Sequence, residues 1–267
     1  MSQQPCGDRR VEHTGYHRQN YLIDGCETTV FRAGTGAPLV YLHGGGTWHG
    51  LAFAEGWSDH FEVILPYHPG FGSSGDNPRI SSMANYVEHY AKLFDAMGLN
   101  SVNLVGFSFG GRLAAEFAAG HGDRVEKLVL VAPAGLDVPE HPQPDFMTIA
   151  PEDIVGYLVN DLKTLLPYLP TGPDEEFDAM RMREGGTVGK MLRGGHLVNP
   201  QMPALLERIN VPVQLIWGQQ DRIVPPGQAP FWQRLLPGSD LHVFDDAGHL
   251  VLDESADARR AIVKFLK

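Results

Sequence analysis

A serine at the centre of the run Gly106-Phe107-Ser108-Phe109-Gly110 is the feature that most restricts what this chain can fold into. The apolar run V-N-L-V at 102–105 precedes it, and a stretch rich in Ala and Leu at 109–119 follows it. A buried strand, a tight turn and a helix are therefore expected in that order. Such a turn strains the serine backbone, needs small neighbours and presents the hydroxyl beside a helix N-terminus. We predict that Ser108 is a nucleophile; the alternative is a tight turn that merely contains a serine.

Short apolar runs of strand length recur along the chain. They lie at 38–42, 62–65, 102–105, 127–131, 211–216 and 241–244. Runs of this kind are typical of strands buried on both faces of a parallel sheet. Helical periodicity at 82–97 and 253–266 alternates with them, and Asp24-Gly25 predicts a hairpin over 20–32. The alternation predicts an α/β fold with a doubly wound, mostly parallel sheet and helices on both faces.

The alternation breaks between residues 136 and 199, a segment rich in Pro and Gly without a convincing strand. One helix is expected from Pro151 to Leu165 and a second from Asp174 to Arg183. We therefore predict two parts. A core covers 1–135 and 200–267, and a small helical cap over 136–199 covers the carboxyl edge of the sheet.

Three consecutive glycines follow an apolar run in His43-Gly44-Gly45-Gly46. Glycines after a buried strand leave backbone N–H groups uncovered, so that they can point at a developing oxyanion. We expect the oxyanion donors to be Gly45, with Gly44 and Gly46 beside it, and Phe109, the residue after the nucleophile. The alternative is a flexible Gly-rich turn. His43 is expected to hold this loop through a backbone hydrogen bond.

An acid and a base follow the serine in the order that acyl transfer on a doubly wound sheet requires. Asp221 lies just beyond the apolar run at 211–216, and His249 lies just beyond the run at 241–244. Asp221 would orient the imidazole of His249. His249 would take the proton of Ser108 and return it to the leaving group. The alternatives are a helix-capping Asp221 and a surface His249.

Several other charged residues have less specific interpretations. Asp137, beyond the run at 127–131, is the alternative acid, and Asp245-Asp246 are expected to be turn residues. Arg181, Arg183 and Arg193 in the cap are expected to be solvated surface charges, with binding of a substrate carboxylate as the alternative.

Two further patterns suggest cofactor sites only superficially. Residues 70–75 match G-x-G-x-x-G, but Asp76-Asn77-Pro78 follow, so that no helix opens within the motif as a dinucleotide site requires. His13 and His17 have the spacing of a helical metal pair, but Gly15 lies between them. We expect neither a metal nor a cofactor.

Composition restricts partners and compartment. The 267 residues carry a formal net charge of -11, which disfavours nucleic acid and anionic membranes as partners. Cys6 and Cys26 are too few for a disulfide framework, and no apolar stretch has the length of a membrane helix or a signal-peptide core. We expect a cytoplasmic protein with a small-molecule substrate, either a monomer or a homodimer.

Five motifs, taken in order, resemble those of the α/β-hydrolase superfamily in its capped branch. They are H-G-G-G at 43–46, P-G-F-G at 69–72, G-F-S-F-G-G at 106–111, W-G-x-x-D-x-x-V-P at 217–225 and A-G-H at 247–249. The resemblance covers nearly the whole chain from about residue 20. It implies a cofactor-free fold of eight mostly parallel strands with the cap inserted after the sixth.

The resemblance also separates candidate activities. Haloalkane dehalogenases and epoxide hydrolases use an aspartate where this chain has Ser108. Meta-cleavage-product hydrolases usually carry Pro-Gly after the glycines and Trp after the catalytic histidine, whereas Thr47-Trp48 and Leu250 stand here. We therefore expect a carboxylesterase that acts on a small, fairly apolar ester. A carbon–carbon hydrolase of a dienone-type ring-cleavage product and a non-catalytic small-ligand receptor are the alternatives.

Overall fold

The computed structural model describes residues 15–150 and 152–267, and within them eight strands form one sheet. The strands are β1 (His17–Ile23), β2 (Cys26–Ala33), β3 (Pro38–Leu42), β4 (Glu62–Pro66), β5 (Val102–Phe107), β6 (Val125–Val131), β7 (Val213–Gly218) and β8 (Asp240–Phe244). Their order across the sheet is β1-β2-β4-β3-β5-β6-β7-β8, and only the pairings of β2 with β1 and β4 are antiparallel. The predicted mostly parallel sheet is confirmed. The expectations about Cys6, His13 and Pro151 lie outside the described residues.

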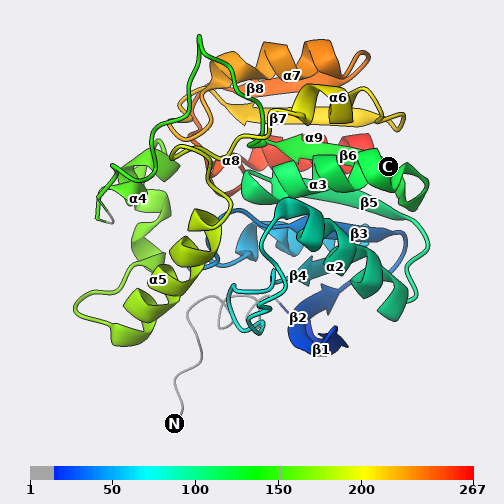
Figure 1. Cartoon of the computed structure of the whole chain (residues 1–267), viewed down its shortest axis with the longest axis horizontal. Coiled ribbons are helices and arrows are strands. Elements are labelled where there is room, and N and C mark those ends of the chain that lie inside the picture. Colours follow the sequence, from blue (N-terminus) through cyan, green and yellow to red (C-terminus); the bar gives the residue numbers. More distant parts are fainter. Residues whose placement is uncertain (1–14, 151) are drawn as a thin grey trace.

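Helices cover both faces of this sheet (Figure 1). They are α2 (Met83–Ala96), α3 (Phe109–Gly120), α4 (Ile154–Leu158), α5 (Glu175–Gly189), α6 (Met202–Leu206), α7 (Ala229–Leu235), α8 (Val251–Glu254) and α9 (Ala256–Leu266). In Figure 1, α2, α3 and α6 lie side by side in front of the sheet, and α9 lies behind it. The predicted doubly wound α/β fold is therefore confirmed.

The turn at Asp24-Gly25 joins β1 and β2 as the sequence predicts. Both residues have positive φ, 50° and 82°, which is the conformation that a two-residue type I′ hairpin needs. The paired strands run from His17 to Ala33, so the hairpin is longer than the predicted 20–32.

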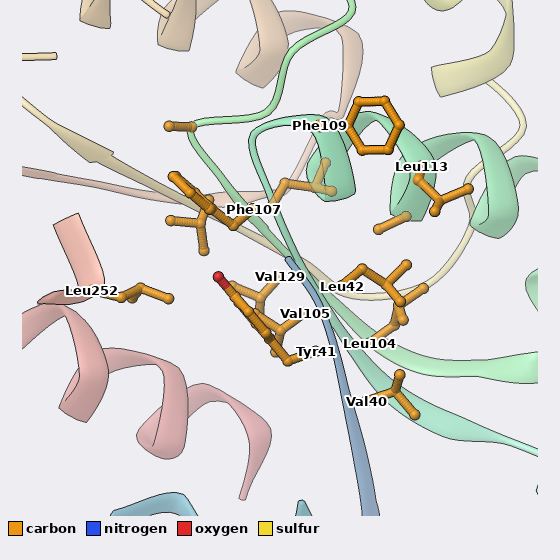
Figure 2. Close-up of a cluster of buried hydrophobic side chains, with 14 of the residues drawn as sticks. Val40, Tyr41, Leu42, Leu104, Val105, Phe107, Phe109, Leu113, Val129 and Leu252 are labelled. Atoms are coloured by element: carbon orange, nitrogen blue, oxygen red, sulfur yellow. The ribbon is translucent and has the colours of Figure 1, made fainter. Parts of the chain in front are cut away.

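The core of the sheet is formed by the apolar side chains of its central strands. Figure 2 shows this cluster, with Phe109 and Leu113 of α3 on one side and Leu252 of α8 on the other. The strand residues Val40, Leu42, Leu104, Val105 and Val129 are all fully buried. Burial of each such side chain is worth about 1.5–3 kcal/mol. The cluster fixes the strand ends from which the functional loops begin.

The segment between β6 and β7 contains helices and loops, and no strand lies among its described residues from 136 to 199. Besides α4 and α5 it holds the short 3-10 helices η3 (Leu162–Thr164) and η4 (Leu166–Tyr168). Figure 1 shows α4 and α5 set to one side of the sheet. Its separation from the core as a cap over 136–199 stays a prediction.

The prediction of one helix from Pro151 to Leu165 is wrong for the residues after Leu158, where α4 ends. Val159 is extended, with φ of -130° and ψ of 155°. The next two N–H groups, of Asn160 and Asp161, donate to the carboxylate of Glu254 at 2.8 and 2.7 Å. These tertiary hydrogen bonds replace the bonds that would have continued the helix.

Two other helix boundaries differ from the expected ones. The helix expected over 253–266 is interrupted at Ser255, whose hydroxyl accepts from the N–H of Ala258 and so begins α9 anew. The helix expected over 174–183 has Asp174 as its N-cap but continues to Gly189.

No helix in the described part of the chain combines the length and the apolar character needed to cross a membrane. Cys26 is a free, buried thiol, with its sulfur 3.4 Å from the carbonyl oxygen of Gly75.

Candidate active site

Ser108 stands between the last residue of β5 and the first residue of α3, with φ of 52° and ψ of -113°. A non-glycine residue held at positive φ costs about 1–3 kcal/mol and persists only where its surroundings enforce it. Here the N–H of Ser108 donates to the carbonyl of Val131 at 2.9 Å. A Cβ at Gly106 would overlap the carbonyl of Gly110, and a Cβ at Gly110 would overlap that of Leu42. The small residues of the run are therefore a requirement of the turn.

The structure brings the three predicted catalytic side chains into one hydrogen-bonded chain. His249 Nδ1 lies 2.8 Å from Asp221 Oδ2, and His249 Nε2 lies 2.9 Å from Ser108 Oγ. Because a carboxylate only accepts, Nδ1 carries the proton and Nε2 accepts from the serine hydroxyl. All three residues are at most 5% exposed. This arrangement can remove a proton from Ser108 when its oxygen attacks a carbonyl.

Asp221 is held in the loop after β7 by its second oxygen. Asp221 Oδ1 accepts from the N–H groups of Ile223 and Val224 at 2.8 and 2.9 Å. The residue therefore also closes a turn, but it does not cap the helix that follows, whose N-cap is Pro225, and Oδ2 stays available to His249. Asp137, the alternative acid, is exposed and takes no part in this contact.

The glycines at 44–46 lie beside the serine. A Cβ at Gly44 would be 3.5 Å from the Cβ of Ser108, and Gly45 and Gly46 line the same cavity as Ser108. Within the described residues, the N–H groups of Gly45 and Gly46 form no hydrogen bond. Phe109 is the first residue of α3, where a helix leaves its N–H without an intrahelical partner. Backbone N–H groups from two separate segments of the described chain therefore lie beside the serine.

His43 holds the glycine loop, as predicted. Its Nδ1 donates to the carbonyl of Gly44 at 2.7 Å, and its Nε2 accepts from the N–H of His68 at 2.9 Å. Complete burial holds the pKa of His43 well below its usual range, and nearby His68 adds to the effect. His43 is therefore neutral, which this pair of contacts requires.

Glu184 is a residue of this site that the sequence did not single out. It lies on α5, is 1% exposed, and accepts hydrogen bonds from Thr47 and from the N–H of Gly72. Thr47 follows the three glycines, so the carboxylate joins α5 to the glycine loop and to the loop at 70–75. Burial raises the pKa of Glu184 above its usual value, whereas these three donors oppose the shift.

The three arginines of the predicted cap have three different environments. Arg183 is not the solvated charge that was expected, because it binds Asp76 and the carbonyls of Gly72 and Ser74. Arg181 lies over the ring of Phe177 and lines the cavity. Arg193 is exposed, as predicted.

A cavity of about 730 Å³ lies between the segment at 146–197 and Ser108. Most of its lining is apolar and comes both from that segment and from the loops around Ser108 and His249. Among the lining residues are Phe146, Met147, Ile154, Leu158, Leu192 and Leu250. Ser108 and His249 reach it from the core, Asp178 and Arg181 from α5, and His49 from the loop after the glycines. The described residues contain no cluster of three or more metal-ligating side chains.

Comparison with known proteins places this geometry in context. A family model described as the alpha/beta hydrolase fold matches residues 37–168 and 199–256. Residues 169–198, which the model does not match, lie inside the predicted cap.

Relatives and solved structures include both ester and carbon–carbon hydrolases. A pimeloyl-[acyl-carrier protein] methyl ester esterase of Chromobacterium violaceum is 30% identical over 88% of this chain and 96% of its own. A 2-hydroxy-6-oxononadienedioate/2-hydroxy-6-oxononatrienedioate hydrolase of Burkholderia vietnamiensis is 29% identical over 93% of this chain and 94% of its own. A thermophilic esterase from Thermogutta terrifontis, whose structure is solved, is 26% identical in sequence. The match covers 94% of this chain and 98% of that esterase, with a TM-score of 0.70.

Proposed function

This chain is a hydrolase of the α/β-hydrolase fold family, and we propose that it cleaves small, fairly apolar carboxylic esters through an acyl-enzyme intermediate. The observation that carries the proposal is the buried chain of hydrogen bonds from Ser108 through His249 to Asp221. Ser108 and His249 line a cavity whose lining is mostly apolar.

Acylation uses the residues as follows. Ser108 Oγ attacks the ester carbonyl while His249 Nε2 takes its proton, and Asp221 stabilises the imidazolium that forms. The N–H groups of Phe109 and Gly45, with Gly46 or Gly44 beside them, hold the oxyanion. The tetrahedral intermediate collapses, its bond to the alcohol oxygen breaks, and His249 returns the proton to that oxygen.

Deacylation repeats these steps with water as the nucleophile. His249 removes a proton from a water molecule, and the oxygen attacks the acyl carbonyl. The same donors hold the second oxyanion. The bond to Ser108 Oγ then breaks, the serine regains its proton from His249, and the carboxylic acid leaves.

A fluorophosphonate probe tests the nucleophile directly. We expect it to label the folded wild-type protein and not Ser108→Ala, which should also lose turnover of short nitrophenyl esters. Ser101→Ala, next to the other end of β5, is the matched control and should label normally. Absence of labelling in folded wild-type protein would contradict the proposal.

Carbon–carbon hydrolysis is the second candidate, because the Burkholderia relative carries that kind of name at 29% identity. Thr47-Trp48 and Leu250 favour the ester, since Pro-Gly and Trp are usual at these places in the carbon–carbon enzymes. A panel of nitrophenyl esters of increasing acyl length and one dienone separates the two. Fast consumption of the dienone with negligible ester turnover would favour carbon–carbon hydrolysis over ester hydrolysis. A tight, saturable ligand without turnover would instead support a receptor.

A further inference from the structure

His49, in the wall of the cavity, forms with Asp253 a second histidine–carboxylate pair that the chemistry above does not use. His49 Nδ1 is 3.5 Å from Asp253 Oδ1, and the two side chains are 7% and 9% exposed. His49 lines the cavity that Ser108 and His249 also line. His49 therefore faces the cavity without belonging to the hydrogen-bonded chain of the serine, whereas Asp253 is not among the lining residues.

The polar atoms of His49 are incompletely satisfied. Nδ1 is buried without a hydrogen bond, and its distance of 3.5 Å to Asp253 Oδ1 is too long for a good one. Nε2 has no hydrogen-bond partner among the described residues. The ring of Trp48 stands edge-on at 5.6 Å and supplies no acceptor there. Nε2 is not fully buried, and His49 lines the cavity, so a ligand in the cavity can reach Nε2 and form a hydrogen bond with it in place of water.

The carboxylate of Asp253 determines which nitrogen of His49 carries the proton. Asp253 lies on α8, four residues after His249, and its carboxylate oxygen Oδ1 lies beside Nδ1 of His49. A carboxylate beside Nδ1 keeps a proton on that nitrogen, so that Nε2 carries a lone pair that points elsewhere. A second proton on the ring would turn Nε2 into a donor.

We propose that His49 binds a hydroxyl group on the substrate, remote from the bond that is cleaved, and that Asp253 positions the imidazole. A hydroxyl both donates and accepts, so it fits Nε2 in either protonation state. A substrate carboxylate would fit only the protonated ring and would face the negative charge of Asp253. The inference rests on the proposed function, since it assigns a substrate class, hydroxylated apolar esters, to the same cavity.

A matched set of esters tests the assignment. In the first pair, 4-nitrophenyl 3-(hydroxymethyl)benzoate is compared with 4-nitrophenyl 3-ethylbenzoate. A second pair consists of the two para isomers of these esters. The homologous pairs carry hydroxyethyl in place of hydroxymethyl and propyl in place of ethyl. Within at least one pair, we expect wild type to favour the hydroxyl ester in kcat/KM, and His49→Phe to reduce that preference about tenfold, the value of one buried hydrogen bond. The plain ester should change little, because its oxyanion and triad are untouched.

Further variants separate binding from structural effects. His49→Gln keeps a polar end and should retain part of the preference. Asp253→Leu should lower the preference with little effect on the plain ester. His242→Phe is the matched control, because His242 pairs with Asp240 at 2.8 Å at an exposed site outside the cavity lining. An unchanged preference in His49→Phe and Asp253→Leu, or an equal loss for both members of each pair, would overturn the inference.

Failure of the proposed function gives a different result. Fluorophosphonate labelling is measured in every variant, and a protein that labels but does not discriminate overturns only the role of His49. A wild-type protein that neither labels nor turns over any ester contradicts the proposed function. In that case calorimetric binding of 3-(hydroxymethyl)benzyl alcohol and 3-ethylbenzyl alcohol decides the site. Tighter binding of the first that is lost in His49→Phe supports it, and equal binding overturns it.

Discussion

The carboxylate of Glu184 accepts both the backbone N–H of Thr47, at 2.9 Å, and its hydroxyl, at 2.5 Å. A third hydrogen bond, from the N–H of Gly72, reaches the same carboxylate at 2.8 Å. Thr47 follows Gly46 directly, so the position of the glycine loop depends on a side chain from α5. The helix that closes the cavity therefore also holds the loop that would stabilise the oxyanion.

Glu184→Gln should lower kcat by about tenfold or more. The amide nitrogen cannot accept, so at least one of the three hydrogen bonds is lost and the glycine loop shifts. Removal of one oxyanion donor altogether costs about 10²–10³ in rate, which sets the upper range. Steady-state kinetics and the rate of fluorophosphonate labelling measure the effect. Glu176→Gln, an exposed change on the same helix, is the control and should behave as wild type. Full activity in Glu184→Gln would refute the coupling.

Asp221→Asn should lower kcat by about 10⁴, the loss that follows when a triad aspartate is replaced by its amide. The amide oxygen can still accept from Ile223 and Val224, so the loop should stay folded. The amide NH₂ would then face His249 Nδ1 and favour the wrong tautomer. Asp137→Asn, at the exposed alternative acid, should keep wild-type kcat. Equal losses in the two variants would contradict the assignment of Asp221.

The fold and the placement of three site residues were predictable because their signals are local. Ser108, Asp221 and His249 each follow an apolar strand in a loop rich in turn residues. Parallel strands bring their carboxyl ends to one edge of the sheet, so separate local signals converge in space. The same logic predicted the glycine loop after the run at 38–42.

The remaining features depend on contacts between distant segments. Glu184 lies 137 residues from Thr47, and nothing in the sequence around either one indicates the partner. The helix predicted to Leu165 has suitable periodicity, yet Glu254 binds the N–H groups just beyond Leu158 and ends it there. His49 resembles any loop histidine until Asp253 and the cavity are placed beside it.

Gly110→Ala should lower the free energy of unfolding by about 2–3 kcal/mol, the upper range for overpacking, and should abolish labelling of Ser108. Its Cβ would overlap the carbonyl of Leu42, and backbone cannot move aside as a flexible side chain can. Gly120→Ala, at the other end of α3, places a Cβ in open space and is the matched control. Urea unfolding measures both. Equal stability of the two variants would show that the turn tolerates a larger residue.

Protonation of His89 should destabilise the fold in mild acid. Burial lowers its pKa to about 4, and its Nε2 lies 3.0 Å from the hydroxyl of Thr28. The unfolded chain has the ordinary value near 6.5, so as pH falls it takes up the proton first. This contribution to stability is complete above pH 6.5 and is lost as pH falls towards 4. Urea unfolding of wild type and His89→Gln should therefore show the stability of wild type, relative to the variant, falling by about 2 kcal/mol from pH 7 to pH 5. A constant difference between the two proteins across that interval would mean that His89 titrates alike in the folded and unfolded chains.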